Sequence, residues 1–90
     1  MSEGWQIAFS DTVVKRDIPR LDYALQKRIR TNIEAKLSVD PIRFGKPLRY
    51  TKSGQRCLRV GDYRVIYLLD PDTLRVMIIT IGHRRDIYES

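Results

Sequence analysis

Two arginines that could grip a phosphate together flank a predicted turn. Arg59 and Arg64 lie on either side of the pair Gly61-Asp62. Glycine accepts the positive φ of a two-residue hairpin turn and aspartate tolerates it, so this pair predicts a β-hairpin that places Arg59 opposite Arg64. Like charges placed directly opposite each other destabilise a strand pair. Either the two side chains extend separately into solvent, or they form a site that binds an anion.

The predicted hairpin has two chemically different faces, because side chains alternate along a strand. One face is apolar and is expected to face the core; it consists of Leu58, Val60, Tyr63, Val65 and Tyr67. The other, which we call the arginine face, consists of Cys57, Arg59, Arg64, Ile66 and Leu68.

A second group of candidate residues follows the last predicted strand, in the stretch Gly82-His83-Arg84-Arg85-Asp86-Ile87-Tyr88. We expect His83 and Arg84 near the end of the arginine face. An arginine there would offset charge developing on a phosphate, and His83 or Tyr88 could move protons. The plainer alternative is a surface histidine without a role. The sequence has no glycine-rich phosphate loop and no metal-ligand spacing, so we expect neither a metal nor a cofactor.

Composition limits the possible partners and compartment. The 90 residues suit one domain, 1–90, and hold 17 Lys and Arg against 11 Asp and Glu, a net charge of +6. This excess, in which arginine outnumbers lysine, favours a polyanionic partner, although a basic protein need not have one. A single cysteine excludes an internal disulfide and a cysteine-based zinc site. With no signal-peptide pattern and no membrane-spanning stretch, the chain is expected to be cytoplasmic.

The order of elements predicts an α+β fold. A strand over 5–9 precedes helices over 11–17 and 21–37, and the second helix has an apolar stripe: Leu21, Leu25, Ile29, Ile33 and Leu37. Pro41, Gly45 and Pro47 predict an irregular segment that Phe44 and Leu48 pin to the core. Three strands then form an antiparallel meander. The expected result is an N-terminal strand, a helical hairpin and a small twisted sheet with helices on one face.

The last strand is expected over 74–81, after a turn formed by Asp70-Pro71-Asp72-Thr73. Pairing Leu69 with Leu74 would place Arg64 opposite Ile79. The arginine face would then also hold Met77, Ile79 and Ile81, which with Ile66 and Leu68 would form an apolar patch that no helix covers. Such a patch on a basic rim predicts a partner protein.

Three stretches of the sequence resemble a known toxin family. The stretch from Arg56 to Tyr67, followed by Ile81-Gly-His-Arg-Arg-Asp-Ile-Tyr88, is similar to the RelE side of the RelE/ParE toxin superfamily, as is Asp40-Pro41 with Gly45-Lys46-Pro47-Leu48. The resemblance implies a small basic endoribonuclease that enters the ribosomal A site and cuts mRNA there. It also implies that the 2′-hydroxyl attacks the adjacent phosphate without a metal, and that a RelB-like antitoxin wraps and blocks the toxin.

The resemblance also assigns roles by position. It implies that Arg64 grips the phosphate, that Arg84 supports the transition state or leaving group, and that Tyr88 lies in or near the site. Arg59 matches a basic residue of the same face, and His83 stands where some members have lysine. Lys52, Arg56 and Arg85 complete the expected RNA contacts.

The sequence departs from the family at Gln55 and Cys57, where well-studied members have basic residues. The general base then falls to Lys52, Arg59 or His83, and Arg56 points to the other face by alternation unless a β-bulge re-aims it. Two alternatives remain open. One is a ParE-like toxin that inhibits DNA gyrase without being an enzyme. The other is an inactive module that only binds an antitoxin.

Overall fold

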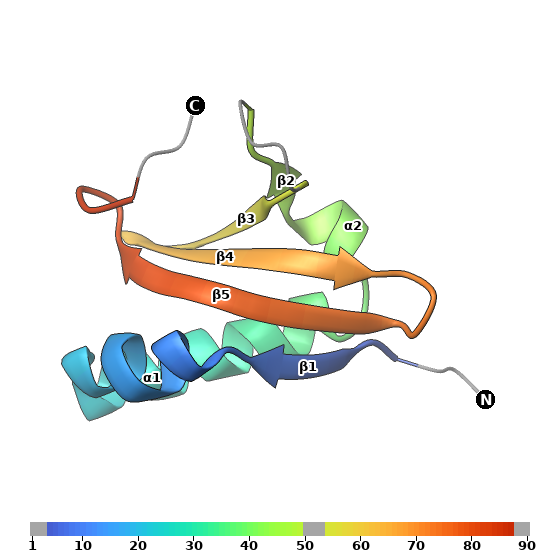
Figure 1. Ribbon diagram of the computed structural model, residues 1–90. Helices are drawn as coiled ribbons and strands as arrows, with labels where there is room; N and C mark the ends of the chain where they lie inside the picture. The colour runs from blue at the N-terminus through green and yellow to red at the C-terminus, as the bar shows by residue number, and fades with distance from the viewer. Residues whose placement is uncertain (1–3, 50–53, 88–90) are drawn as a thin grey trace.

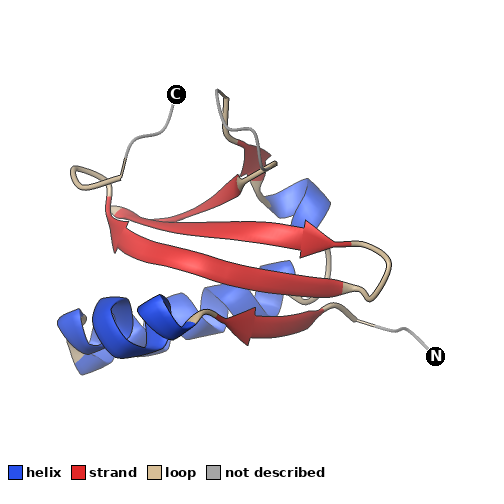
Figure 2. Cartoon of the chain, in the orientation of Figure 1, coloured by secondary structure: helices blue, strands red, loops and turns tan. Residues whose placement is uncertain are grey.

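The protein is a five-stranded sheet with its long helices packed on one face (Figures 1 and 2). We describe it from a computed structural model, which defines residues 4–49 and 54–87. The strand order is β1-β5-β4-β3-β2. The strands are β1 (Gln6–Phe9), β2 (Lys46–Pro47), β3 (Arg56–Val60), β4 (Tyr63–Asp70) and β5 (Arg75–His83). β1 pairs with β5 in parallel and the other pairs are antiparallel, which confirms the predicted α+β class.

The helical layer follows the predicted apolar stripe. A helical segment comprises η1 (Val13–Asp17) and η2 (Ile18–Arg20), and the main helix comprises α1 (Tyr23–Asn32) and its π-helical end η3 (Ile33–Leu37). The Asp22 carboxylate accepts a hydrogen bond from the Leu25 N–H at 2.8 Å and caps α1. Leu21, Ile29, Ile33 and Leu37 are buried against the sheet, and Leu25 is half-buried. Of the described residues, none belongs to a helix long and apolar enough to cross a membrane.

The first hairpin is as predicted. Arg59 pairs with Arg64 and Val60 with Tyr63, across a turn in which Gly61 has a φ of +59°. The apolar face enters the core: Leu58, Val60, Val65 and Tyr67 are buried, and Tyr63 packs against them. The division between core face and arginine face is therefore confirmed.

The predicted register of the second hairpin is wrong. The turn spans 71–74, where Leu74 takes a left-handed φ of +52°, so that Asp70 pairs with Arg75 and Leu69 with Val76. Further along, Ile66 pairs with Thr80 but Tyr67 with Ile78, which leaves Ile79 as an extra residue in β5. This β-bulge reverses the alternation of the strand beyond it. Arg64 consequently lies opposite Gly82 rather than Ile79.

The bulge also takes Ile81 out of the predicted apolar patch. Met77 lies on the arginine face as expected, although its partner there is Leu68; Ile81 instead pairs with Val65 and is buried in the core. Ile66 is only 3% exposed, and Leu68, Met77 and Ile79 are half-buried. The more exposed large apolar side chains lie elsewhere: Phe9, Val14, Tyr23, Val39, Ile42 and Phe44.

A buried carboxylate completes the edge of β5. β1 stops at Phe9, and the Ser10 N–H donates to the Ile78 carbonyl. The next open donor of β5, the Ile81 N–H, is satisfied by Oδ2 of buried Asp17 at 3.0 Å, while Oδ1 accepts from Arg16 Nε at 3.0 Å. This contact ties η1 to the end of β5, because an unpaired buried N–H would cost free energy.

The segment predicted as irregular is instead ordered around Tyr67. It forms a short helix, α2 (Pro41–Phe44), and the edge strand β2. The hydroxyl of Tyr67 donates to the Pro41 carbonyl at 2.6 Å, and a Cβ on Gly45 would lie 1.7 Å from that hydroxyl. Phe44 does not pin the segment to the core as expected, since it is 42% exposed; buried Pro41 does so instead.

Candidate phosphate-binding site

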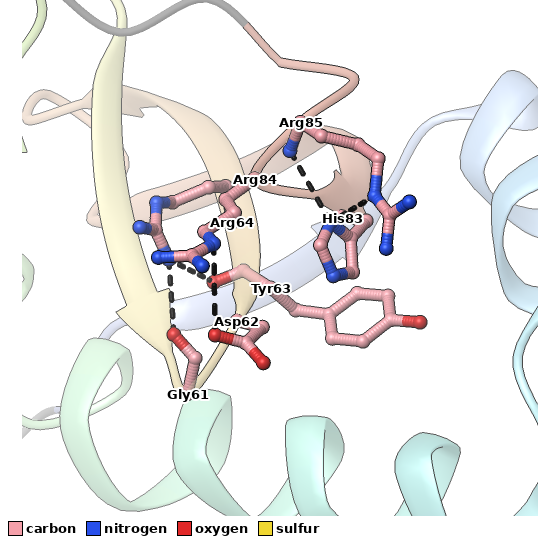
Figure 3. Close-up of polar contacts among 7 residues, drawn as sticks. All are labelled: Gly61, Asp62, Tyr63, Arg64, His83, Arg84 and Arg85. Atoms are coloured by element: carbon pink, nitrogen blue, oxygen red, sulfur yellow. Dashed lines mark hydrogen bonds and ion pairs between the residues drawn. The ribbon is translucent and has the colours of Figure 1, made fainter.

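The hairpin tip positions Arg64. Its side chain is only 8% exposed, and its Nη1 donates to the carbonyls of Gly61 and Tyr63, each at 3.0 Å (Figure 3). Arg59, its cross-strand neighbour, is exposed. The repulsion between the two cations is relieved because Arg64 folds over the turn and Arg59 points into solvent. A guanidinium held in this way is preorganised to bind an anion.

Arg84, which directly follows β5, reaches the same turn. Its N–H donates to the Asp62 carbonyl at 2.7 Å, and its Nε lies 3.7 Å from Asp62 Oδ1 (Figure 3). Its side chain is 63% exposed. The structure therefore brings Arg64 and Arg84 together at one end of the sheet, as the sequence predicted. One guanidinium is buried and hydrogen-bonded, and the other is exposed to solvent.

A third arginine at this turn was not foreseen. This residue is Arg28, on α1. Its Nη2 lies 2.9 Å from the position that a Cβ on Gly61 would occupy. Glycine at position 61 therefore has two roles: it accepts the positive φ of the turn, and its lack of a Cβ leaves room for the Arg28 guanidinium. No local sequence signal predicts the contact, because it joins two elements that only the fold brings together.

His83 lies on the opposite face from Arg64, contrary to the prediction. It pairs with Tyr63, and the two rings meet edge to face with centroids 5.4 Å apart (Figure 3). Its Nδ1 accepts hydrogen bonds from the Arg85 N–H and from Arg85 Nε, each at 3.2 Å. The bulge at Ile79 is the cause, since it exchanges the faces of Gly82 and His83. His83 and Arg85 therefore form a separate group that is not directed at Arg64.

Arg56 also lies away from the arginine face. It pairs with Tyr67, and its Nη2 donates to the carbonyls of Ile42 and Gly45 at 2.6 and 2.9 Å. Arg56 thus anchors α2 to the sheet. Cys57 is buried opposite Ile66. Two of the predicted site residues, Lys52 and Tyr88, lie outside the described part of the chain.

A basic groove continues the site along the sheet edge. It has a volume of about 710 Å³ and is lined by Lys36, Phe44, Lys46, Pro47, Leu48, Arg49, Cys57, Leu58 and Arg59. Four of these nine side chains are cationic, and none of these nine lining residues is acidic. A groove of this charge suits the backbone of a single-stranded nucleic acid. Arg59 links it to the hairpin that holds Arg64.

Burial perturbs one titratable group near this groove. Desolvation raises the pKa of Tyr67 above its ordinary value of 10.0, and the hydrogen bond and charge of Arg56 partly oppose the shift. Tyr67 therefore remains a neutral donor to Pro41 at physiological pH. Within 4–49 and 54–87, no group of three or more His, Cys, Asp or Glu side chains is placed to hold a metal ion. The chemistry offered by the described residues is the binding and charge stabilisation of a phosphodiester by arginine.

Known proteins share both the sequence and the fold. The family model for the ParE toxin of type II toxin–antitoxin systems matches residues 7–88. The chain is 35% identical over 77 residues to Toxin RelG of Mycobacterium tuberculosis, covering 86% of this chain and 88% of that protein. It is 36% identical over 84 residues to Toxin RelE of the same organism, covering 93% and 86%.

Solved structures agree with these similarities. The toxin–antitoxin complex RelBE2 of Mycobacterium tuberculosis contains a chain that superposes with a TM-score of 0.83 at 30% identity, covering 93% of this chain and 95% of that one. The archaeal RelE–RelB complex from Pyrococcus horikoshii has the same fold, with a TM-score of 0.73 at 23% identity over 90% and 96% of the two chains. The chain thus belongs to the RelE/ParE toxin superfamily of type II toxin–antitoxin systems, as a RelE-like member.

Proposed function

We propose that this protein is the toxin of a type II toxin–antitoxin module and cuts mRNA on the ribosome. The observation that supports this most directly is the convergence of Arg64 and Arg84 on one turn, beside a groove lined by four cations. The similarity to Toxin RelG and Toxin RelE supports the same activity. The site of action would be the cytoplasm, where ribosomes and mRNA meet.

In the proposed reaction, the 2′-hydroxyl attacks the adjacent phosphorus and the 5′-oxygen of the next nucleotide leaves. Arg64, fixed by two carbonyls, would hold the non-bridging oxygens in a fork. Arg84, exposed and movable, would stabilise the charge that develops on the phosphorus-bound oxygens or on the leaving group. Arg59 and the groove cations would position the RNA strand, and none of these steps calls on a metal.

Fewer residues are proposed for proton transfer than the sequence suggested. Cys57 is buried, and His83 faces away from Arg64, so neither is assigned the role of base. Lys52 and Tyr88 remain proposed participants. Arg85 is proposed as an RNA contact at the end of the sheet, next to Arg84.

An acidic antitoxin is the proposed protein partner. The toxin carries a net charge of +6, and its arginine face and groove would be covered by carboxylates in the inhibited complex. The solved complexes of similar toxins with RelB antitoxins support this partner.

Primer extension on translated mRNA tests the activity. The variant Arg84→Ala should lower cleavage at least 100-fold without unfolding the protein, because the Arg84 side chain is exposed. Arg64→Ala should lose as much, and circular dichroism should verify its fold. Arg75→Ala is the matched control, since Arg75 is an exposed arginine at the far end of β5. Cuts that appear without ribosomes, or that persist in both variants, would contradict the proposal.

A second candidate, gyrase inhibition, follows from the description of the matching family as ParE toxin. A supercoiling assay separates the two. Loss of supercoiling with intact mRNA would assign the chain to the gyrase-directed class. Normal growth on overexpression, with neither effect, would assign it to antitoxin binding alone.

A further inference from the structure

A second pocket lies on the helix-covered side of the sheet, away from Arg64. Its volume is about 350 Å³, and it opens between η1, η2 and the ends of β4 and β5. The residues that line it include Arg16, Arg20, Tyr63, Ile81, His83 and Ile87. The volume is within the range of small-ligand sites. The mechanism proposed above does not use this pocket.

The walls of this pocket suit a flat ring. Tyr63 and His83 form an aromatic corner, with centroids 5.4 Å apart and planes at 78°. Leu21, Ile81 and Ile87 add apolar surface. Ile87 lies so close to Gly82 that its Cδ1 would be 3.0 Å from a Cβ there. Aromatic side chains of this kind are the platforms on which proteins stack unpaired bases.

Its charge differs from that of the basic groove. Two arginines, Arg16 and Arg20, are matched by two carboxylates, Asp17 and Asp86. Asp17 is already engaged by Arg16 and by the Ile81 N–H. The lining is therefore balanced, whereas the groove has four cations and no acid among its lining residues. A balanced aromatic pocket favours a neutral heterocycle over a phosphate.

The chain links the two sites directly. Tyr63 and Arg64 are consecutive residues of β4 and point to opposite faces, and so do His83 and Arg84 at the end of β5. We propose that an unpaired RNA base enters this pocket and stacks on His83 and Tyr63 while Arg64 and Arg84 grip a neighbouring phosphate. The RNA strand then turns around the end of the sheet. This inference rests on the proposed function, and it makes the pocket a determinant of base preference.

Neutral nucleosides test the pocket without involving the phosphate site. Adenosine, guanosine, cytidine and uridine are titrated separately into ¹⁵N-labelled protein. At least one should shift the amide signals of Tyr63, Ile81, His83 and Ile87 in a saturable way. The variant His83→Ala should weaken that binding at least 5-fold, His83→Phe should restore it, and Arg75→Ala should leave it unchanged. Ile87→Ala, which removes the opposite apolar wall, replaces His83→Ala if that variant does not fold.

Other outcomes overturn the proposal. They are shifts confined to the groove residues, the absence of shifts at the solubility limit, or equal binding by His83→Ala. A pocket that binds N-acetyltryptophanamide but no nucleoside would instead receive a side chain of a partner protein.

Cleavage assays separate this inference from the proposed function. If the pocket reads a base, His83→Ala should still cut mRNA on the ribosome but with a flatter base preference. Cleavage with an unchanged preference would overturn the pocket and leave the proposed function intact. Nucleoside binding in a protein that never cuts mRNA would overturn the proposed function and leave the base-binding pocket intact.

Discussion

The Nε of Arg84 lies 3.7 Å from Oδ1 of Asp62, at the tip of the hairpin that positions Arg64. The two side chains are 63% and 66% exposed, so solvent screens their attraction and the pair contributes little to stability. The carboxylate nevertheless competes with any anion that approaches Arg84. In the proposed site, a phosphate that binds Arg84 would have to displace the Asp62 carboxylate.

We predict that Asp62→Asn strengthens RNA binding. Asparagine retains the turn preference of aspartate but removes the competing charge. Affinity for an uncleavable 2′-O-methyl RNA should rise about 3- to 10-fold at low salt and by less at high salt, because the effect is electrostatic. Fluorescence anisotropy at two salt concentrations measures it. Asp72→Asn, in the exposed turn at the other end of β4, changes the net charge equally and should have a smaller effect.

Arg64 and Arg59 should respond differently to replacement by lysine. Arg64 is buried and fixed by two carbonyls, and lysine cannot reproduce its planar fork. Arg64→Lys should therefore lower single-turnover mRNA cleavage about 100-fold. Arg59 is exposed, and a point charge there suffices to attract RNA, so Arg59→Lys should lose less than about 3-fold.

The comparison of these two variants isolates geometry from charge, since both keep the net charge. Equal losses would show that the two arginines act only as charges, and would remove Arg64 from the role of phosphate clamp.

The sequence predicted the first hairpin because its determinants are local. Gly61-Asp62 specifies the turn, and alternation from that turn determines which side chains flank Arg64. The second hairpin was predicted less well because two features are not local. Leu74 adopts a left-handed conformation that its side chain disfavours, which lengthens β4 to Asp70. That shift alone moves the pairing by two residues and leaves every face unchanged.

The bulge at Ile79 had the larger consequence for the site. One extra residue reverses the faces of everything beyond it, so Ile81 enters the core and His83 leaves the arginine face. Packing favours the bulge, since it lets both Ile78 and Ile81 join the buried core cluster. Tertiary contacts of this kind, like that between Arg28 and Gly61, have no signature in a single sequence.

Gly45→Ala should destabilise the protein strongly. The added Cβ would lie 1.7 Å from the Tyr67 hydroxyl and 2.7 Å from the ring carbon that bears it. Tyr67 is fully buried and hydrogen-bonded to Pro41, so it cannot move aside cheaply. We expect a loss of about 3 kcal/mol in the free energy of unfolding, measured by urea denaturation.

Gly54→Ala is the control for this variant. Gly54 has a φ of +71°, but none of the described residues lies within 4 Å of the added Cβ, so backbone strain alone should cost about 1 kcal/mol. Similar losses in the two variants would mean that the close approach of Tyr67 to Gly45 is not the reason why a Cβ at position 45 destabilises the protein.

Tyr67 should make stability sensitive to alkaline pH. Burial raises the pKa of its phenol above the ordinary value of 10.0. Near neutral pH the phenol is protonated in both states, and its hydrogen bond to Pro41 is fully formed. Above pH 10 the unfolded chain ionises first, so this contribution falls as the pH rises through the folded-state pKa.

The variant Tyr67→Phe tests the pH dependence by removing the titrating group. It should lose about 1 to 2 kcal/mol at pH 8, because the Pro41 carbonyl is left without its buried donor. The gap between wild type and variant should narrow as urea denaturation is repeated from pH 9 to pH 11, since only the wild type can lose this stabilisation by ionising. A gap that stays constant over this range would mean that the phenol has the same pKa in both states, and that burial of Tyr67 does not oppose its ionisation.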